Sequence, residues 1–180
     1  MADTAVLVID MLNAYRHPDA EHLMNSAADI IEPLADLIHR GRDREDIDVV
    51  YVNDNYGDFT GDWDDIVRAA LEGARPDLVK PILPNPDCLR LTKVRHSAFY
   101  ATQLDYLLKQ RKSDRLVITG QVTEQCVLYT ALDAYIRHYE VVVPHDAVAH
   151  IDAGLGAAAL EMMRRNMRAQ VVPAAQCLPA

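Results

Sequence analysis

Residues 115–133, RLVITGQVTEQCVLYTALD, decide the fold. The segment 116–118 is apolar and rich in β-branched side chains. It ends at Thr119 and Gly120, and a helical pattern starts at residue 123 or 124. A buried strand that leads through a glycine turn into a helix is half of a βαβ unit, where such folds bind ligands. Cys126 falls in the first helical turn, where the positive helix end favours thiolate over thiol. The segment predicts a parallel α/β fold with a nucleophilic cysteine.

The rest of the chain alternates strand and helix patterns. Apolar runs predict strands at residues 4–9, 48–53, 116–118, 140–144 and 170–172, with a weak signal at 88–91 leading to Lys93. Helical spacing predicts helices at 20–41, 62–73, 102–111, from 123 or 124 onward, and 153–168. Pro33 implies a kink or a later start of the first helix, and four prolines exclude a long regular element at 75–88. We expect residues 1–180 to form a single-domain three-layer α/β/α sandwich with a mainly parallel sheet.

Composition limits the classes of partner. The chain has 180 residues, 27 acidic against 18 basic side chains, and a net charge of −9. Binding of nucleic acid or an anionic membrane needs a concentrated basic face, which this balance opposes. The opening segment MADTAVLVID lacks the basic residues and the long apolar run of a secretion signal. Three cysteines without a CxxC pair do not suggest a disulfide framework, so we expect a cytoplasmic protein with reduced thiols.

Three reactive side chains follow three of the predicted strands: Asp10, Lys93 and Cys126. Carboxyl ends of parallel strands meet at one edge of a sheet, so these side chains are expected in one pocket. There the carboxylate can take the thiol proton, the ammonium can stabilise the thiolate, and the sulfur can attack a carbonyl. Taken singly, each has an ordinary reading as a turn residue, a solvated side chain or a small core residue. Their joint placement favours catalysis.

Three motifs resemble the isochorismatase-like cysteine hydrolases, a family that includes nicotinamidases and N-carbamoylsarcosine amidases. They read AVLVIDMLNAY, KVRHSAFYATQLDYLL and ITGQVTEQCVLYTALDAY. The resemblance implies that Asp10 is the general base, Lys93 the catalytic lysine and Cys126 the nucleophile. It also implies a cis peptide bond between Gln121 and Val122. The backbone N–H groups of Val122 and Cys126 would then form the oxyanion hole.

The chain departs from this family's pattern in two places. Nicotinamidases carry Asp-x-His after the second strand and bind a metal there, whereas this chain has Asp54-Asn55-Tyr56. We therefore expect no metal and no cofactor, with Asp54 a solvated or hydrogen-bonding residue at a strand end. In the first motif Leu12 and Ala14 replace the usual Gln and Asp. Isochorismatases proper cleave a vinyl ether and lack the cysteine, so its presence favours an amide substrate.

Further residues are candidates for the substrate pocket. Asn13, Tyr15 and Phe99 lie near the catalytic motifs. The segment NYGDFTGDW supplies Tyr56, Phe59 and Trp63, which form either a pocket wall or a subunit contact. Arg95 is a candidate to bind a substrate carboxylate, but a structural ion pair is the role we expect for it. The spacing of His96, His138, His145 and His150 suggests no site, and Cys88 and Cys177 are expected to be inert.

These observations predict a cysteine-dependent amidohydrolase that cleaves the C–N bond of a small amide or ureido compound through a thioester. Two alternatives stay open: a catalytically idle binding or regulatory protein on the same fold, and an isochorismatase-type hydrolase of a non-amide substrate. A redox thiol protein is disfavoured, because no resolving cysteine lies nearby in sequence. We expect a small-molecule substrate, no nucleic-acid or membrane partner, and a homo-oligomer.

Overall fold

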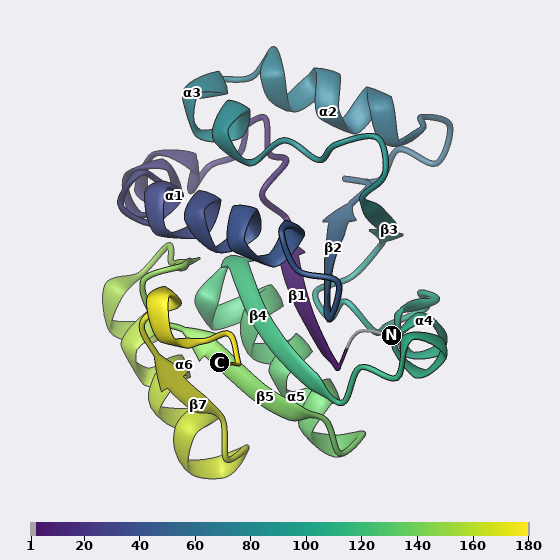
Figure 1. The fold of residues 1–180 in the computed structure, drawn as a ribbon. Helices are drawn as coiled ribbons and strands as arrows, with labels where there is room; N and C mark the ends of the chain where they lie inside the picture. Colours follow the sequence, from purple (N-terminus) through teal and green to yellow (C-terminus); the bar gives the residue numbers. More distant parts are fainter. Residues whose placement is uncertain (1–2, 180) are drawn as a thin grey trace.

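The computed structural model describes residues 3–179 and contains one parallel β-sheet of seven strands (Figure 1). The strand order is β3-β2-β1-β4-β5-β7, and β6 pairs with β4. The strands are β1 (Thr4–Ile9), β2 (Ile47–Asp54), β3 (Leu89–Lys93), β4 (Arg115–Gln121), β5 (Glu140–Pro144), β6 (Val148–Ala149) and β7 (Gln170–Val172). Figure 1 shows the carboxyl ends of β1, β2 and β4 together at the upper edge of the sheet.

Helices cover both faces of this sheet. They are α1 (Ala20–Arg42), α2 (Trp63–Leu71), α3 (Pro76–Val79), α4 (Leu104–Arg111), α5 (Leu128–Ile136) and α6 (Ala153–Asn166), with short turns η1 (Lys80–Ile82), η2 (Thr123–Val127) and η3 (Ala174–Gln176). Strand β1 lies between two apolar clusters because its side chains alternate in direction. Val6 and Val8 pack in the cluster that contains α1, whereas Ala5 and Leu7 pack with α4, α5 and α6. The predicted three-layer parallel fold is confirmed.

Several element boundaries differ from the sequence prediction. Helix α1 runs unbroken from Ala20 with Pro33 inside it, so the alternative of a later start was wrong. Strand β3 extends to Lys93 instead of ending at residue 91. The helix predicted from residue 123 opens with the π-helical turn η2, and α6 ends at Asn166 rather than 168. Strand β6 was not anticipated, because two residues are too few for a periodic signal.

Gly120 allows the two central strands to approach closely at the site. Its φ is 103°, and a Cβ atom there would lie 2.1 Å from the carbonyl oxygen of Ile9. Only glycine adopts this conformation without strain or collision. The register pairs Ile9 with both Gly120 and Val52, so β1 ends level with its neighbours. The residues that follow these strands therefore meet in one place.

No helix in the described part of the chain is both long and apolar enough to cross a membrane.

Candidate active site

Asp10, Lys93 and Cys126 meet at the carboxyl edge of the sheet, as the sequence predicted. The Nζ atom of Lys93 lies 2.8 Å from Asp10 Oδ2 and 3.7 Å from Cys126 Sγ. The Lys93 side chain is fully buried, and the Asp10 side chain is only 10% exposed. Asp10 also accepts a hydrogen bond from the Asp54 backbone N–H at 2.8 Å. A carboxylate, an ammonium and a thiol thus share one desolvated site.

The thiol of Cys126 is protonated at rest. Burial, with the nearby Asp10 carboxylate, raises its pKa to about 12, although Lys93 opposes the shift. The sequence-based expectation that the helix end would favour thiolate was therefore wrong for the net balance. The missing factor was desolvation, which disfavours the charged form of any buried acid. Attack by this sulfur requires a base that takes the proton as the reaction proceeds.

The two charged partners of the thiol affect each other. Burial raises the pKa of Asp10, while the adjacent Lys93 ammonium pulls it back down. Burial alone would lower the pKa of Lys93, but Asp10, Cys126 and Asp54 outweigh it and raise that pKa. Lys93 is therefore a fixed cation. Asp10, a carboxyl group with a raised pKa beside a thiol, suits proton transfer at neutral pH.

The segment around the cysteine has an unusual backbone. The Gln121–Val122 peptide bond is cis, and the π-helical turn η2 carries Cys126. π-Helical turns are rare and occur frequently at functional sites. The Val122 backbone N–H donates toward the sulfur, which stabilises negative charge there. The side chain of Gln121 is held in place by donating to the Asp10 carbonyl oxygen at 2.8 Å and accepting from the Tyr15 hydroxyl.

A cavity of about 340 Å³ opens onto the sulfur. Its walls come from the loop after β1, the start of α1, the end of β2 and the turn η2. The lining residues are Asp10, Asn13, His17, Asp19, Leu23, Asp54, Tyr56, Gln121, Val122, Gln125, Cys126 and Ile151. Wider hollows of about 510 and 700 Å³ lie elsewhere, but no cysteine lines either of them. The smaller cavity is the one of these three that Cys126 and the Asp10 carboxylate line together.

Asn13, Tyr15 and Tyr56 were predicted as pocket residues, and each lies at the cavity. Asn13 and Tyr56 line it, and Tyr15 is buried behind it against Gln121. The Tyr56 hydroxyl donates to the Leu12 carbonyl oxygen at 3.1 Å, so the ring folds back over the loop after β1 although its outer edge stays exposed. Asp10, Tyr15 and Tyr56 all have positive φ angles, of 52° to 53°. Such backbone conformations cluster at functional sites.

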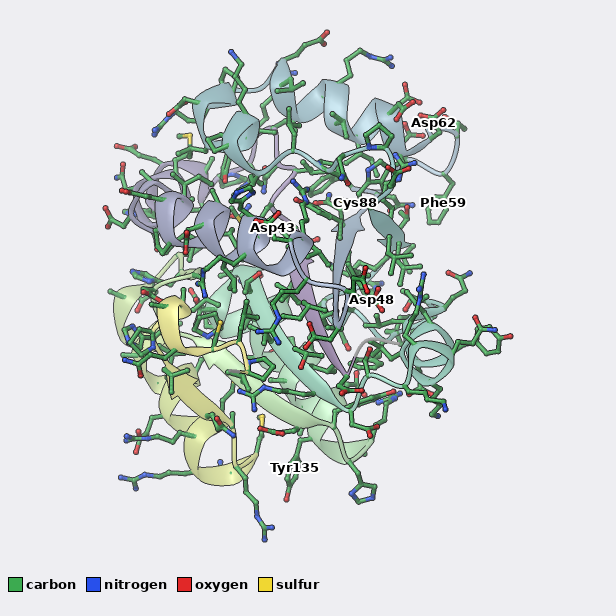
Figure 2. The ribbon with its side chains drawn as sticks, viewed as in Figure 1. Asp43, Asp48, Phe59, Asp62, Cys88 and Tyr135 are labelled. Atoms are coloured by element: carbon green, nitrogen blue, oxygen red, sulfur yellow. The ribbon has the colours of Figure 1, made fainter. Side chains whose placement is uncertain are left out.

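Phe99 and Trp63 do not line the cavity, so the sequence placed them wrongly. Phe99 is buried in the cluster of α4, α5 and α6, where its ring lies 5.8 Å from that of Tyr139 and 4.8 Å from the Arg137 guanidinium carbon. Trp63 begins α2 and packs against the small cluster around Leu12. Both aromatic rings serve the core. Phe59 and Asp62 lie on the loop before α2 (Figure 2), and Phe59 is 79% exposed.

Sequence reasoning missed two residues that contact the catalytic side chains. Asp54 was expected to be solvated or hydrogen-bonding. It accepts the Tyr56 backbone N–H and pairs with Lys93 at 3.3 Å, which makes it a second carboxylate of the site. The Nδ1 atom of His96 lies 3.7 Å from Cys126 Sγ, and its ring lies 5.5 Å from that of Tyr129. The parallel pairing of Asp54 with Lys93 is a signal for the first residue. His96 lies in an irregular loop, for which the sequence has no comparable signal.

The described residues contain no cluster of three or more His, Cys, Asp or Glu side chains arranged to hold a metal ion.

Comparison with known proteins identifies the group to which the chain belongs. The sequence profile of the isochorismatase domain matches residues 4–176. The chain belongs to the isochorismatase family. It is 32% identical over 177 residues to the isochorismatase family protein YaaI of Bacillus subtilis, covering 98% of this chain and 97% of YaaI. It is 31% identical to the ureidoacrylate amidohydrolase RutB of Caulobacter vibrioides, over 80% of this chain and 76% of RutB.

Solved structures of the isochorismatase family share this fold. The N-carbamoylsarcosine amidase of Thermoplasma acidophilum superimposes with a TM-score of 0.73 at 28% identity, covering 97% of each chain. The resemblance drawn from the three sequence motifs is confirmed. The chain is a hydrolase of the isochorismatase family, and relatives in this family act on non-peptide C–N bonds.

Proposed function

We propose that the protein is a cysteine-dependent amidohydrolase of a small amide or carbamoyl compound, with Cys126 as nucleophile. The observation that carries the proposal is the buried Lys93, whose ammonium contacts both the Asp10 carboxylate and the Cys126 sulfur. A catalytically idle binding protein would not need this buried cation, because placing a charge in the interior costs desolvation free energy even when the charge is paired. The amidohydrolase names of relatives such as RutB and the carbamoylsarcosine amidase support the same class of reaction.

In the first half-reaction Asp10 accepts the thiol proton of Cys126 as the sulfur attacks the substrate carbonyl. The negative charge that leaves the sulfur develops on the carbonyl oxygen. The backbone N–H groups of Val122 and Cys126 are proposed to stabilise this oxyanion, and the fixed charge of Lys93 lowers the energy of the transient thiolate. Asp10 then gives its proton to the departing nitrogen. The C–N bond breaks, the amine or ammonia leaves, and a thioester remains on Cys126.

The second half-reaction releases the acid and restores the enzyme. Asp10, now ionised again, removes a proton from a water molecule that attacks the thioester carbonyl. Collapse of the intermediate breaks the C–S bond, and the leaving sulfur takes the proton back from Asp10. Protons balance over the cycle, since Asp10 accepts and returns one proton in each half. Desolvation gives Asp10 the raised pKa that suits both tasks.

The test is ammonia release from a panel of small primary amides and carbamoyl compounds. We expect Cys126→Ala to lose at least about a thousandfold in kcat/KM, because removing a nucleophile leaves only binding and oxyanion stabilisation. Folding of the variant is checked by its circular dichroism and thermal midpoint. Near-native turnover by Cys126→Ala would contradict the proposed nucleophile. A non-amide hydrolase would instead act on vinyl ethers or esters and release no ammonia.

We also propose that the chain works as a homo-oligomer in the cytoplasm. Large apolar side chains are exposed along α5 and α6: Tyr129, Leu132, Tyr135, Ile136, Leu155 and Met162. Tyr135 points away from the body of the molecule in Figure 2. Aromatic side chains are enriched in subunit interfaces. The three cysteines are free, which suits a reducing compartment. Light scattering of the purified chain at micromolar concentration tests the oligomeric state, and a monomer would contradict it.

A further inference from the structure

The catalytic cavity carries a negative charge that the proposed reaction does not require. Three of its lining residues are aspartates: Asp10, Asp19 and Asp54. The buried Lys93 behind the cavity pairs with two of them, Asp10 and Asp54. Two carboxylates against one ammonium leave a net charge of −1. Moving the thiol proton to Asp10 during catalysis shifts this charge to the sulfur without changing its sum.

Asp19 adds a second negative charge at the mouth of the cavity. It precedes α1, is exposed, and its side chain makes no capping hydrogen bond to that helix. Its side chain has no hydrogen-bond or ion-pair partner among the described residues. An aspartate at neutral pH is ionised. No arginine or lysine is among the described residues that line this cavity, so no fixed cation there is available to bind a substrate anion.

We propose that the substrate is an amide or carbamoyl compound without a carboxylate, either uncharged or cationic. This inference rests on the proposed function. A substrate carboxylate would enter a low-dielectric space beside like charges, and like-charge juxtaposition opposes binding. Families that recognise carboxylates use the arginine fork, which this cavity lacks. The chain would therefore discriminate against ureidoacrylate, the ureido acid in the name of its relative RutB, and Asp19 would be a residue that determines specificity.

Chemical modification of Cys126 measures the effect of the cavity's negative charge, and it does not require the substrate to be known. Iodoacetamide and iodoacetate alkylate a thiolate by the same displacement of iodide, but only iodoacetate carries a carboxylate. The two rate constants are measured under the same conditions at pH 8. The site of labelling is assigned by peptide mass spectrometry. The ratio of the two constants is divided by the same ratio for a small model thiol, which removes the intrinsic difference in reactivity.

We expect iodoacetate to be disfavoured by at least about tenfold after this normalisation, equivalent to about 1.4 kcal/mol. Sodium chloride at 0.5 M should narrow the difference, because salt screens exposed charges. Asp19→Asn should narrow it by about threefold at low salt, as expected when one partly screened charge is removed. The matched control is Asp29→Asn, which lies within α1 and lines a different hollow; it should leave the ratio unchanged.

A normalised ratio near one, or faster reaction with iodoacetate, would overturn the inference. An unchanged ratio in Asp19→Asn, together with a preserved tenfold difference, would overturn the role of Asp19. The same contrast is then repeated with turnover, using a ureido acid and its uncharged amide. Failure of the proposed function is a separate result. Activity retained in Cys126→Ala would remove the nucleophile, whereas the alkylation ratio would still report the charge of the cavity.

Discussion

Replacing Lys93 by methionine removes the only cation in contact with both Asp10 and Cys126 among the described residues. Methionine keeps much of the lysine stem, so the main loss is the charge. At 3.7 Å from the sulfur, a unit charge stabilises a thiolate by roughly 4 kcal/mol at an effective dielectric constant of about 20. This corresponds to about three pKa units. It is an upper limit, because Asp10 without its partner would more readily take up a proton and stop repelling the thiolate.

We therefore expect Cys126 alkylation by iodoacetamide at pH 8 to slow by about 10- to 100-fold in Lys93→Met, as the thiol pKa rises by one to two units. The assay is the pH dependence of labelling between pH 7 and 10, with the modified peptide quantified by mass spectrometry. Arg95→Met is the matched control, since Arg95 is exposed and does not line the cavity. An unchanged profile in Lys93→Met, or a shift only in Arg95→Met, would refute the assignment of the cation.

The same substitution has a second consequence, for stability. It leaves Asp10 and Asp54 close together without a counter-ion, which should cost roughly 3 to 5 kcal/mol of unfolding free energy at pH 7. The loss of Lys93 raises the Asp10 pKa further, and a carboxyl group with a raised pKa stabilises the fold at low pH and loses that effect as pH rises. The deficit should therefore be smaller at pH 5 than at pH 7. Urea unfolding at the two pH values checks the sign, and a larger deficit at pH 5 would contradict it.

Three further predictions concern Gly120, metal dependence and His96. Gly120→Ala should destabilise the fold by about 3 kcal/mol or more in urea unfolding, because its Cβ would meet the Ile9 carbonyl at a φ that side chains avoid; a loss under about 1 kcal/mol would contradict this. Activity should survive exhaustive dialysis against EDTA, since Tyr56 stands where the Asp-x-His motif of nicotinamidases has its histidine; loss with EDTA and recovery with zinc or iron would reverse that expectation. His96→Gln should change the rate constant of Cys126 alkylation by iodoacetamide, because the Nδ1 atom of His96 lies 3.7 Å from the sulfur; a rate constant equal to that of the wild type would show that the imidazole does not act on the thiol.

The strand and helix order could be predicted from sequence because parallel strands buried on both faces are continuous apolar runs. The segment 4–9 and β1 coincide, and so do 140–144 and β5. Glycine and β-branched residues at 116–120 fixed the turn before the cysteine. What the sequence could not show was local deviation from a regular period. The π-helical turn η2 has the apolar spacing of an ordinary helix start, and the two-residue strand β6 is too short for any pattern.

The candidate site, like the fold, could be predicted from the sequence only in part. Asp10, Lys93 and Cys126 follow or end strands, and the sheet itself brings strand ends together, so topology was enough to group them. Topology did not place Phe99 correctly: it is close to Lys93 in sequence, but its ring packs on the face of the sheet that α4, α5 and α6 cover. His96 was overlooked because its approach to the sulfur depends on a loop path. The net electrostatics of the thiol also required a structure, because burial is a property of the packed molecule.

The central claim is that Cys126 carries the acyl group between the two half-reactions. The most direct measurement is rapid acid quench of the enzyme during turnover of an amide that it hydrolyses, followed by peptide mass spectrometry. The account predicts a transient adduct with the mass of the substrate acyl group on the peptide that contains Cys126, and no adduct in Cys126→Ala. Full turnover without any adduct at Cys126, together with ammonia release by Cys126→Ala, would contradict it.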